Sequence, residues 1–224
     1  KGKFKAPSTN HNPSLEPKDL PLLMAAIISD RMAIPTRLLI EWQLHTMVRP
    51  NEAAGSRWAE IDLDSQTWII PKGRMKKVGT ATQWEKRKDH TIPLTTQTLA
   101  ILNLMKPFSG HLEYVFPNQR DRDAKAGPDS ANNALKRAGL KGKQTAHGMR
   151  TIASSTLNEE QFNPDVIEAA LYHLDPNEQR RTYNRTDYFN QRCVMMEWWS
   201  NRIEEAATGN MSMAANSRGL RAIN

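Results

Sequence analysis

Two short β-prone runs interrupt a chain whose apolar pattern is otherwise helical, and they restrict the folds that are open to it. The runs are Thr67–Ile70 and residues 91–94 (Thr-Ile-Pro-Leu), and turn residues bound both of them. The strongly basic stretch between them, residues 72–90, predicts a long hairpin with a charged tip. Residues 114–116 (Tyr-Val-Phe) offer one further short strand. The pattern predicts a mostly helical domain with one small sheet.

Helical periodicity covers most of the remaining sequence. Two apolar stripes, each after a proline, consist of Leu20, Leu23, Met24 and Ile27 and of Leu38, Leu39, Trp42 and Met47. Further helices are predicted over residues 53–58, 95–105 and, in succession, from about 129 to 207, with 189–206 as the last. The six tryptophans, including Trp198 and Trp199, are expected in the core rather than as base-stacking platforms.

The sequence divides into three parts. Residues 1–16 carry Pro, Asn, Ser and Lys without periodicity and predict a linker or arm, and residues 17–207 form one domain. Residues 208–224 are rich in Gly, Ser and Asn and predict a flexible tail. With 224 residues and 38% hydrophobic content the chain can bury one substantial core. It begins without Met, so we expect it to be a piece of a longer protein.

Charge and composition narrow the class of protein. The net charge of +7 and a pI near 9.6 favour a polyanionic partner, of which nucleic acid is the commonest. No apolar run approaches the roughly 18 residues that span a bilayer, and the basic N-terminus lacks the apolar segment of a secretion signal. Cys193 is the single cysteine, which excludes an internal disulfide and favours a reducing, cytoplasmic location.

The histidines give no sign of a metal site. His11, His45, His90 and His111 show no compact ligand spacing, and a cysteine-based zinc site would need ligands that are absent. No metal and no cofactor are therefore expected.

Four short segments contain side chains suited to chemistry. They are residues 48–52 (Val-Arg-Pro-Asn-Glu), 147–150 (His-Gly-Met-Arg), 171–173 (Leu-Tyr-His) and 182–185 (Thr-Tyr-Asn-Arg). Each has an ordinary structural explanation when taken singly. Arg49 can pair with Glu52 at helical spacing, for example, and His173 can be a hydrogen-bonded structural histidine.

Their order and spacing, however, resemble the signature of the tyrosine recombinase (phage integrase) family. That signature has an arginine after an apolar helix, a lysine in a hairpin, His-x-x-Arg opening a helix, a histidine, and a tyrosine about ten positions later. The chain is similar in sequence to integrases of temperate phages, satellite phages and genomic islands over residues 46–53, 57–62, 74–76 and 183–188. The resemblance spans roughly residues 17–206. It implies an α+β, mostly α catalytic domain with a small antiparallel three-stranded sheet.

The resemblance also implies a chemistry. A tyrosine attacks one DNA phosphodiester, forms a 3′-phosphotyrosine and frees a 5′-hydroxyl, and a hydroxyl of the partner strand later reverses the step. The residues matching the two arginines, Arg49 and Arg150, bind the non-bridging phosphate oxygens through planar guanidinium forks. His147 orients a phosphate oxygen or assists proton transfer near the tyrosine, and His173 donates a hydrogen bond to a non-bridging oxygen. Many family members have Gly where this chain has Tyr172.

The proton for the leaving 5′-oxygen comes, by the same resemblance, from the hairpin lysine. The best match is Lys76, in Arg-Met-Lys. The basic stretch is longer than usual for the family, so Lys77, Lys86 and Lys88 are alternatives. Most of these lysines are expected to form a solvated basic loop against the DNA backbone.

For the nucleophile the sequence favours Tyr183 over Tyr188. The spacing of Tyr183 from His173 and the sequence Tyr-Asn-Arg both match the family signature. Tyr188 follows five residues later and would lie on another helical face. Tyr188 is expected to pack that helix against the core.

The family also implies partners. These are double-stranded DNA attachment sites, a homotetramer on DNA from a monomer when free, and a directionality factor, in the cytoplasm of a bacterial host. DNA-binding domains precede the catalytic domain in family members, so residues 1–16 would be the linker from them. Two alternatives share part of the evidence: a type IB topoisomerase, and a catalytically inactive DNA-binding module.

Overall fold

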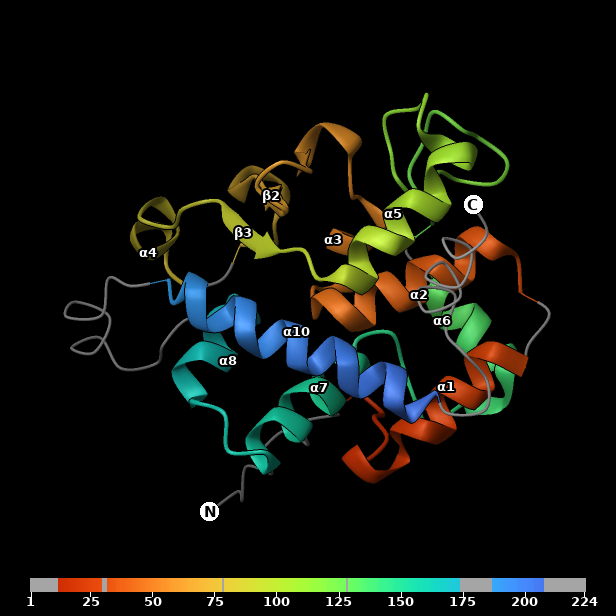
Figure 1. Ribbon diagram of the computed structural model, residues 1–224. Coiled ribbons are helices and arrows are strands. Elements are labelled where there is room, and N and C mark those ends of the chain that lie inside the picture. The colour runs from red at the N-terminus through yellow and green to blue at the C-terminus, as the bar shows by residue number, and fades with distance from the viewer. Residues whose placement is uncertain (1–11, 30–31, 78, 128, 174–186, 208–224) are drawn as a thin grey trace, which may run out of the picture.

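The computed structural model describes residues 12–29, 32–77, 79–127, 129–173 and 187–207. Helices form most of the molecule, and a small sheet lies at the upper left of Figure 1. The helix α10 (Phe189–Ala206) crosses the face seen in that view and contacts the helices α1, α2 and α8 and the strand β3. The predicted fold, mostly α with a small antiparallel sheet, is confirmed.

The first two predicted helices are present. A short 3₁₀ helix η1 (Pro17–Asp19) leads into α1 (Leu20–Ser29), and α2 (Ile34–Thr46) follows. A proline stands in the first turn of η1 and of α2, where the absent N–H has no helical partner to lose. Both predicted apolar stripes are buried: Leu20, Leu23, Met24, Ile27, Leu38, Leu39, Trp42 and Met47.

The predicted helix over residues 53–58 is wrong in its position. The helix α3 (Pro50–Ala54) begins earlier and stops at Gly55, and a 3₁₀ turn η2 (Trp58–Glu60) follows. Ser56 explains the break, because its hydroxyl donates to the backbone oxygen of Ala53 and accepts from the indole of Trp42 at 3.1 Å. Both bonds fix a turn where the apolar pattern alone suggested continued helix.

The sheet has the antiparallel order β1-β2-β3, with β1 (Ile61–Asp62), β2 (Thr67–Ile70) and β3 (His90–Pro93). Both predicted β-prone runs are confirmed, within one residue. The third strand, expected at 114–116, is instead Ile61–Asp62. Tyr114 forms only an isolated bridge with Arg57, and the two residues after it are buried in the core.

The basic stretch connects β2 to β3 as a hairpin, which confirms that prediction, but it also contains helical turns. These are η3 (Lys72–Arg74) and α4 (Ala81–Glu85). Thr80 caps α4, since its hydroxyl accepts from the backbone N–H of Gln83, and the Gln83 side chain accepts from Thr80 N–H.

The other helices follow the predicted succession. They are α5 (Thr96–Ser109), α6 (Ser130–Leu135), η4 (Lys136–Leu140), α7 (Gly148–Glu159), α8 (Pro164–Ala170) and α10. In α10 the side chains of Met195, Met196, Trp199 and Ile203 are buried, whereas Val194 is 70% exposed. The helix thus packs on its own domain, as expected.

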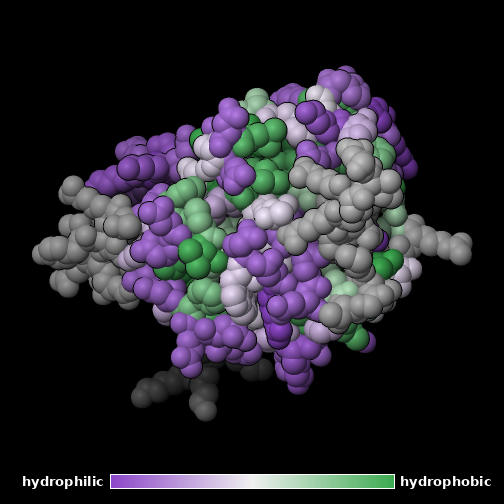
Figure 2. Space-filling model, viewed as in Figure 1, coloured by the Kyte–Doolittle hydropathy of each residue, from purple (hydrophilic) through white to green (hydrophobic). Residues whose placement is uncertain are grey.

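Three of the six tryptophans lie in the core as predicted, and Trp58, Trp84 and Trp198 are partly buried against it. Trp42, Trp68 and Trp199 are fully buried, and Trp42 lies 5.1 Å from the ring of Trp68. The Trp199 indole donates to Leu44 O at 2.8 Å, which joins α10 to α2. Trp198 is partly buried and packs against Phe162 with the two rings tilted by 59°. On the face seen in Figure 2, hydrophilic side chains surround smaller apolar areas.

Candidate active site

Arg49 is held at the start of α3. Its backbone N–H and its Nη1 both donate to the carboxylate of Glu52, at 3.0 and 3.2 Å, so Glu52 caps the helix and orients the guanidinium. Met47, just before, adopts a left-handed φ of 56° that turns the chain at the end of α2. The Arg49–Glu52 pair named as the structural alternative therefore exists, and it also presents the arginine.

Glu52 is also part of a wider hydrogen-bond network that the sequence did not predict. Arg74 donates through Nε and Nη2 to the two oxygens of Glu60, at 2.8 and 2.7 Å, and through Nη1 to Glu52 O at 3.1 Å. The indole of Trp68 donates to the same Glu60 at 3.0 Å. A Cβ on Gly55 would lie 2.8 Å from Arg74 Nη1, so glycine leaves room for this fork. The network ties the sheet to the helix that carries Arg49.

Arg150, in α7, is buried and joins three segments. Its Nη1 donates to Met47 O at 2.5 Å, and its Nη2 donates to Leu171 O at 2.7 Å and to Nε2 of His173 at 2.9 Å. Burial and then the positive charge of Arg49 lower the pKa of Arg150 to about 10. The guanidinium is still charged at neutral pH, and Arg49 lies near enough to repel it.

His173 follows α8 and contacts Arg150. An arginine can only donate, so Nε2 accepts from it and the ring proton sits on Nδ1, which donates to Glu168 at 2.9 Å. Burial and the charge of Arg150 lower the pKa of His173, and Glu168 opposes them. The preceding Tyr172 has a left-handed φ of 52°, a conformation that favours the glycine found in many relatives. Tyr172 thus adopts a backbone conformation that a glycine would adopt readily.

His147 stands at the N-cap of α7 with an exposed side chain. Partial burial lowers its pKa below the ordinary 6.5, and so do the positive charges of Arg150, Arg49, Lys76 and His173. Such effects fade over about 10 Å in solution. The structure thus brings five of the six predicted residues into one positively charged site.

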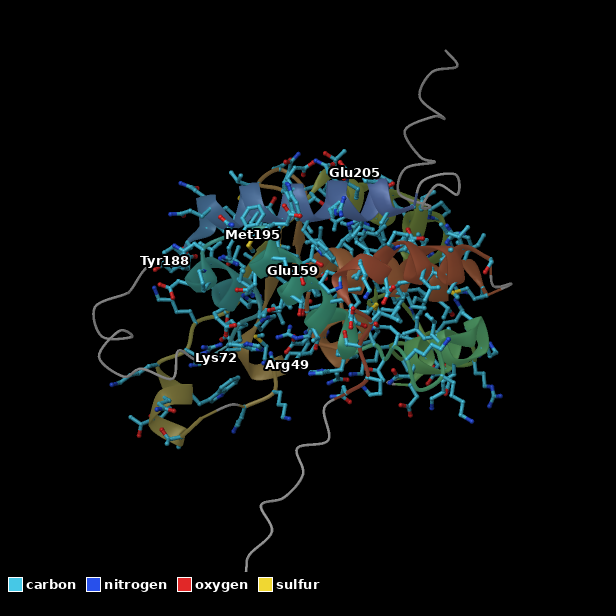
Figure 3. All side chains as sticks on the ribbon, turned by 90° about the horizontal axis from the view of Figure 1, so that it is seen from below. Arg49, Lys72, Glu159, Tyr188, Met195 and Glu205 are labelled. Atoms are coloured by element: carbon cyan, nitrogen blue, oxygen red, sulfur yellow. The ribbon has the colours of Figure 1, made fainter. Side chains whose placement is uncertain are left out.

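The lysines of the hairpin differ in what they contact. Lys76, just after η3, is exposed and its charge acts on His147, whereas the amine of Lys72 donates to Glu85 O at 2.9 Å. Lys77, Lys86 and Lys88, the alternatives to Lys76, are also in this hairpin. Figure 3 shows Arg49 and Lys72 on the side of the molecule away from α10, where Glu205 lies. The charge of Lys76 thus acts on His147, a residue of the predicted site.

The sixth residue, Tyr183, lies outside the described residues. Tyr188 precedes α10 rather than lying within it, with a left-handed φ of 52°, and its partly buried ring packs against the core. Arg192, one turn later, is buried and donates to Thr91 O at 2.6 Å and to Asp187 O at 2.8 Å. It anchors the start of α10 on β3, a role with no signal in the sequence.

Residues 13–15, expected to be linker, contact the segment that carries His147. Thr145 N–H donates to Pro13 O at 3.0 Å, Leu15 N–H donates to the Gln144 side chain at 2.8 Å, and the Ser14 hydroxyl donates to Gly148 O at 2.9 Å. A Cβ on Gly148 would lie 2.2 Å from Pro13 O. Glycine at this position lets the incoming chain pass directly over the start of α7.

Within the described ranges no group of three or more His, Cys, Asp or Glu side chains is placed to hold a metal ion. His45 and His90 are buried instead: His45 Nδ1 lies 2.9 Å from the Ser200 hydroxyl, and His90 Nε2 lies 3.2 Å from Ala170 O. None of the described helices has the length and apolar character needed to cross a membrane.

The fold matches solved recombinases. An integrase from mycobacterium phage Brujita superposes with a TM-score of 0.61 at 17% identity, over 96% of this chain and 66% of that one. A lambda integrase (residues 75–356) dimer bound to a COC′ core site gives 0.55 at 17% identity, over 75% and 60%. At such identities the likeness concerns the fold alone.

Other relatives have a higher sequence identity to this chain than these solved structures have. Prophage integrase IntA of Escherichia coli is 45% identical over 215 residues, 96% of this chain and 50% of its own length. The integrase of Enterobacteria phage P4 is 30% identical over 210 residues, 91% of this chain and 48% of its own. This chain spans about half the length of these relatives. The model of the phage integrase family matches residues 13–189, so the chain belongs to that family.

Proposed function

We propose that this chain is the catalytic part of a site-specific DNA recombinase that cleaves and rejoins strands through a 3′-phosphotyrosine at Tyr183. One observation supports this most strongly. Arg49 and Arg150, from separate segments, lie near enough to repel one another, and Arg150 hydrogen-bonds to two carbonyl oxygens and His173. The two guanidinium groups and the Lys76 ammonium outnumber the two nearby carboxylates, Glu52 and Glu168, and leave an excess of positive charge that suits a phosphodiester.

The proposed step gives each side chain one task. The phenolic oxygen of Tyr183 forms a bond to phosphorus, and the bond from phosphorus to the 5′-oxygen breaks. Arg49 and Arg150 stabilise the charge that grows on the non-bridging oxygens. Lys76 protonates the leaving 5′-oxygen. The bond energy stays in the phosphotyrosine, so the strand can be rejoined without a nucleotide cofactor.

The lowered pKa values suit the two histidines to these tasks. A neutral His147 can accept the phenolic proton of Tyr183, and the surrounding cations favour its neutral form. His173 presents Nε2 as an acceptor to Arg150 in the free protein. A bound phosphate anion favours its protonation, after which Nε2 can donate to a phosphate oxygen.

The partners follow from the family and from solved relatives. Solved structures include the XerH recombinase bound to its difH substrate and a lambda integrase dimer bound to a COC′ core site. We extend this to double-stranded attachment sites for this chain, with the net charge of +7 as support. Assembly as a homotetramer on DNA from free monomers, a directionality factor, a preceding DNA-binding region ahead of residues 17–207 and a bacterial cytoplasmic location belong to the same proposal.

The test is covalent capture. The protein is mixed with attachment-site DNA nicked near the scissile phosphate, so that the short freed strand diffuses away, and a denaturant-resistant adduct is sought. Tyr183→Phe should abolish the adduct and retain DNA binding, whereas Tyr188→Phe, the matched control, should form it. An adduct at normal yield in Tyr183→Phe contradicts the assignment. Binding without any wild-type adduct favours the inactive DNA-binding alternative.

The same assay separates this chemistry from metal-assisted cleavage, and strand exchange separates it from relaxation alone. The adduct should form at full yield in EDTA, because two guanidinium groups supply the charge that a metal would otherwise provide. Loss of the adduct in chelator, with recovery on adding magnesium, would refute the assigned roles. Relaxation of supercoils without exchange between two sites would point to the topoisomerase alternative.

A further inference from the structure

The part of the β2–β3 hairpin that leads into β3 is hydrogen-bonded to the loop that carries His173. Arg87 donates through Nη2 to Tyr172 O at 2.8 Å and through Nη1 to His173 O at 3.2 Å. The hydroxyl of Tyr172 donates back to Lys88 O at 2.5 Å. Three bonds thus join segments about 85 positions apart in sequence.

The faces of the same side chains are also in contact. The guanidinium carbon of Arg87 lies 3.5 Å from the centre of the Tyr172 ring, a close cation–π contact, and the ring of His90 lies 4.7 Å from it on the hairpin. Tyr172 has the left-handed φ of 52° that bulky residues rarely adopt. The contacts from the hairpin are what hold an aromatic residue in a glycine-like conformation.

His173 is consequently held by three contacts, although its side chain is exposed. Its ring nitrogens contact Glu168 and Arg150, and its carbonyl oxygen accepts from Arg87. Leu171 O, two residues earlier, accepts from Arg150. A shift of this loop would therefore disturb both the imidazole and the buried guanidinium.

We infer that Arg87 is a positioning residue: through its fork and stack on Tyr172 it holds His173, and with it Arg150, in place for the phosphate. This rests on the proposed function. In this arrangement Arg87 directs both Nη groups and one face of its guanidinium at Tyr172 and His173. Its neighbours Lys86 and Lys88 expose their side chains and are better suited to contact DNA.

The experiment separates positioning from DNA binding. Arg87→Ala should slow single-turnover adduct formation on nicked DNA by about 10- to 100-fold, as small misplacements near a reacting centre do. Its affinity for DNA and the dependence of that affinity on salt should match wild type. Lys86→Ala, at an expected DNA contact, serves for comparison and should weaken binding with a shallower salt dependence. Normal cleavage by Arg87→Ala, or a loss explained by a reduced salt dependence, overturns the inference.

A second measurement identifies the group that Arg87 serves. A substrate with sulfur in place of the bridging 5′-oxygen releases a thiolate, which needs no proton, so defects in the general acid disappear on it. The defect of Arg87→Ala should persist on this substrate, and Arg87→Ala with His173→Ala should be no slower than His173→Ala alone. Rescue by sulfur would mean that Arg87 serves Lys76 instead, and would overturn the inference.

Conservative variants cover the case in which Arg87→Ala folds poorly. Arg87→Lys keeps the charge but cannot form the two-pronged contact, so its cleavage should be slowed like that of Arg87→Ala. Tyr172→Phe keeps the ring and loses the bond to Lys88 O, so its defect should be smaller. Wild-type rates in Arg87→Lys would contradict the inference. Absence of any adduct with wild-type protein would instead count against the proposed function.

Discussion

Two parts of the site are built in opposite ways. Arg150 donates to Met47 O, Leu171 O and His173, Arg49 is paired with Glu52, and His173 with Glu168. Lys76, in contrast, sits on an exposed connection and has no hydrogen bond or ion pair within the described residues.

The difference corresponds to two chemical tasks. Stabilising charge on a phosphate depends on donors that are already aligned, since their reorganisation would add to the barrier. A general acid must instead reach an oxygen that moves as its bond breaks, and it must exchange its proton with water. A buried network suits the first task and an exposed loop suits the second.

The largest expected effect comes from the hydrogen-bonded part of the site, around Arg49 and Arg150. Arg150→Lys keeps a positive charge but loses the planar fork on Met47 O and Leu171 O, so adduct formation should slow by about 100- to 1,000-fold. Affinity for DNA should change little, because many phosphate contacts remain. Sulfur substitution at the leaving oxygen should not restore the rate. A loss of less than about threefold would show that the fork is dispensable.

Substitution of the exposed Lys76 should have a different effect from substitution of Arg150. Lys76→Ala should slow cleavage of ordinary nicked DNA by about 100-fold and cleave the sulfur-substituted substrate near the wild-type rate. Lys77→Ala, its neighbour and control, should cleave both substrates normally. If Lys77→Ala shows the sulfur-dependent rescue and Lys76→Ala does not, the general acid is Lys77.

A smaller effect tests the contact between residues 13–15 and the start of α7. Gly148→Ala places a Cβ 2.2 Å from Pro13 O, so one of the two segments must move. We expect a loss of stability of about 1–3 kcal/mol and slower cleavage through His147. Gly73→Ala is the control, because nothing lies within 4 Å of its Cβ. Urea unfolding measures both, and equal stability of the two variants would contradict the packing.

The smallest effect concerns the core beneath the site. Burial lowers the pKa of His45 to about 3 and holds that of His90 well below its ordinary 6.5. Below about pH 6.5 the unfolded chain binds protons that the folded chain does not, so stability falls as pH falls. The slope should approach about 1.4 kcal/mol per pH unit for each histidine.

Urea unfolding between about pH 6.5 and pH 5 measures this slope, above the range in which carboxylates titrate. His45→Gln should reduce it by the share of one buried histidine, since His90 still contributes, as do His147 and His173 through their lowered pKa values. A stability that does not change over this interval would show that both histidines are protonated in the folded protein.

Local pattern was enough for the elements whose signal lies within a few residues. Apolar stripes and prolines located α1 and α2, and β-branched runs located β2 and β3. Errors arose where a contact distant in sequence outweighed the pattern. The Trp42–Ser56 bond ended the helix expected at 53–58, and pairing with Trp68 made Ile61 a strand in place of residues 114–116.

The site divides in the same way. The sequence alone determined which residue types carry the chemistry, because the arginine, lysine, histidine and tyrosine segments have an order and spacing that resemble one family. Only the tertiary structure decided what holds them: the Glu52–Arg74–Glu60 network, the Arg87–Tyr172 contact and the passage of Pro13 over Gly148. Hydrogen bonds and close contacts between residues so far apart in the chain depend on packing, and no local periodicity encodes them.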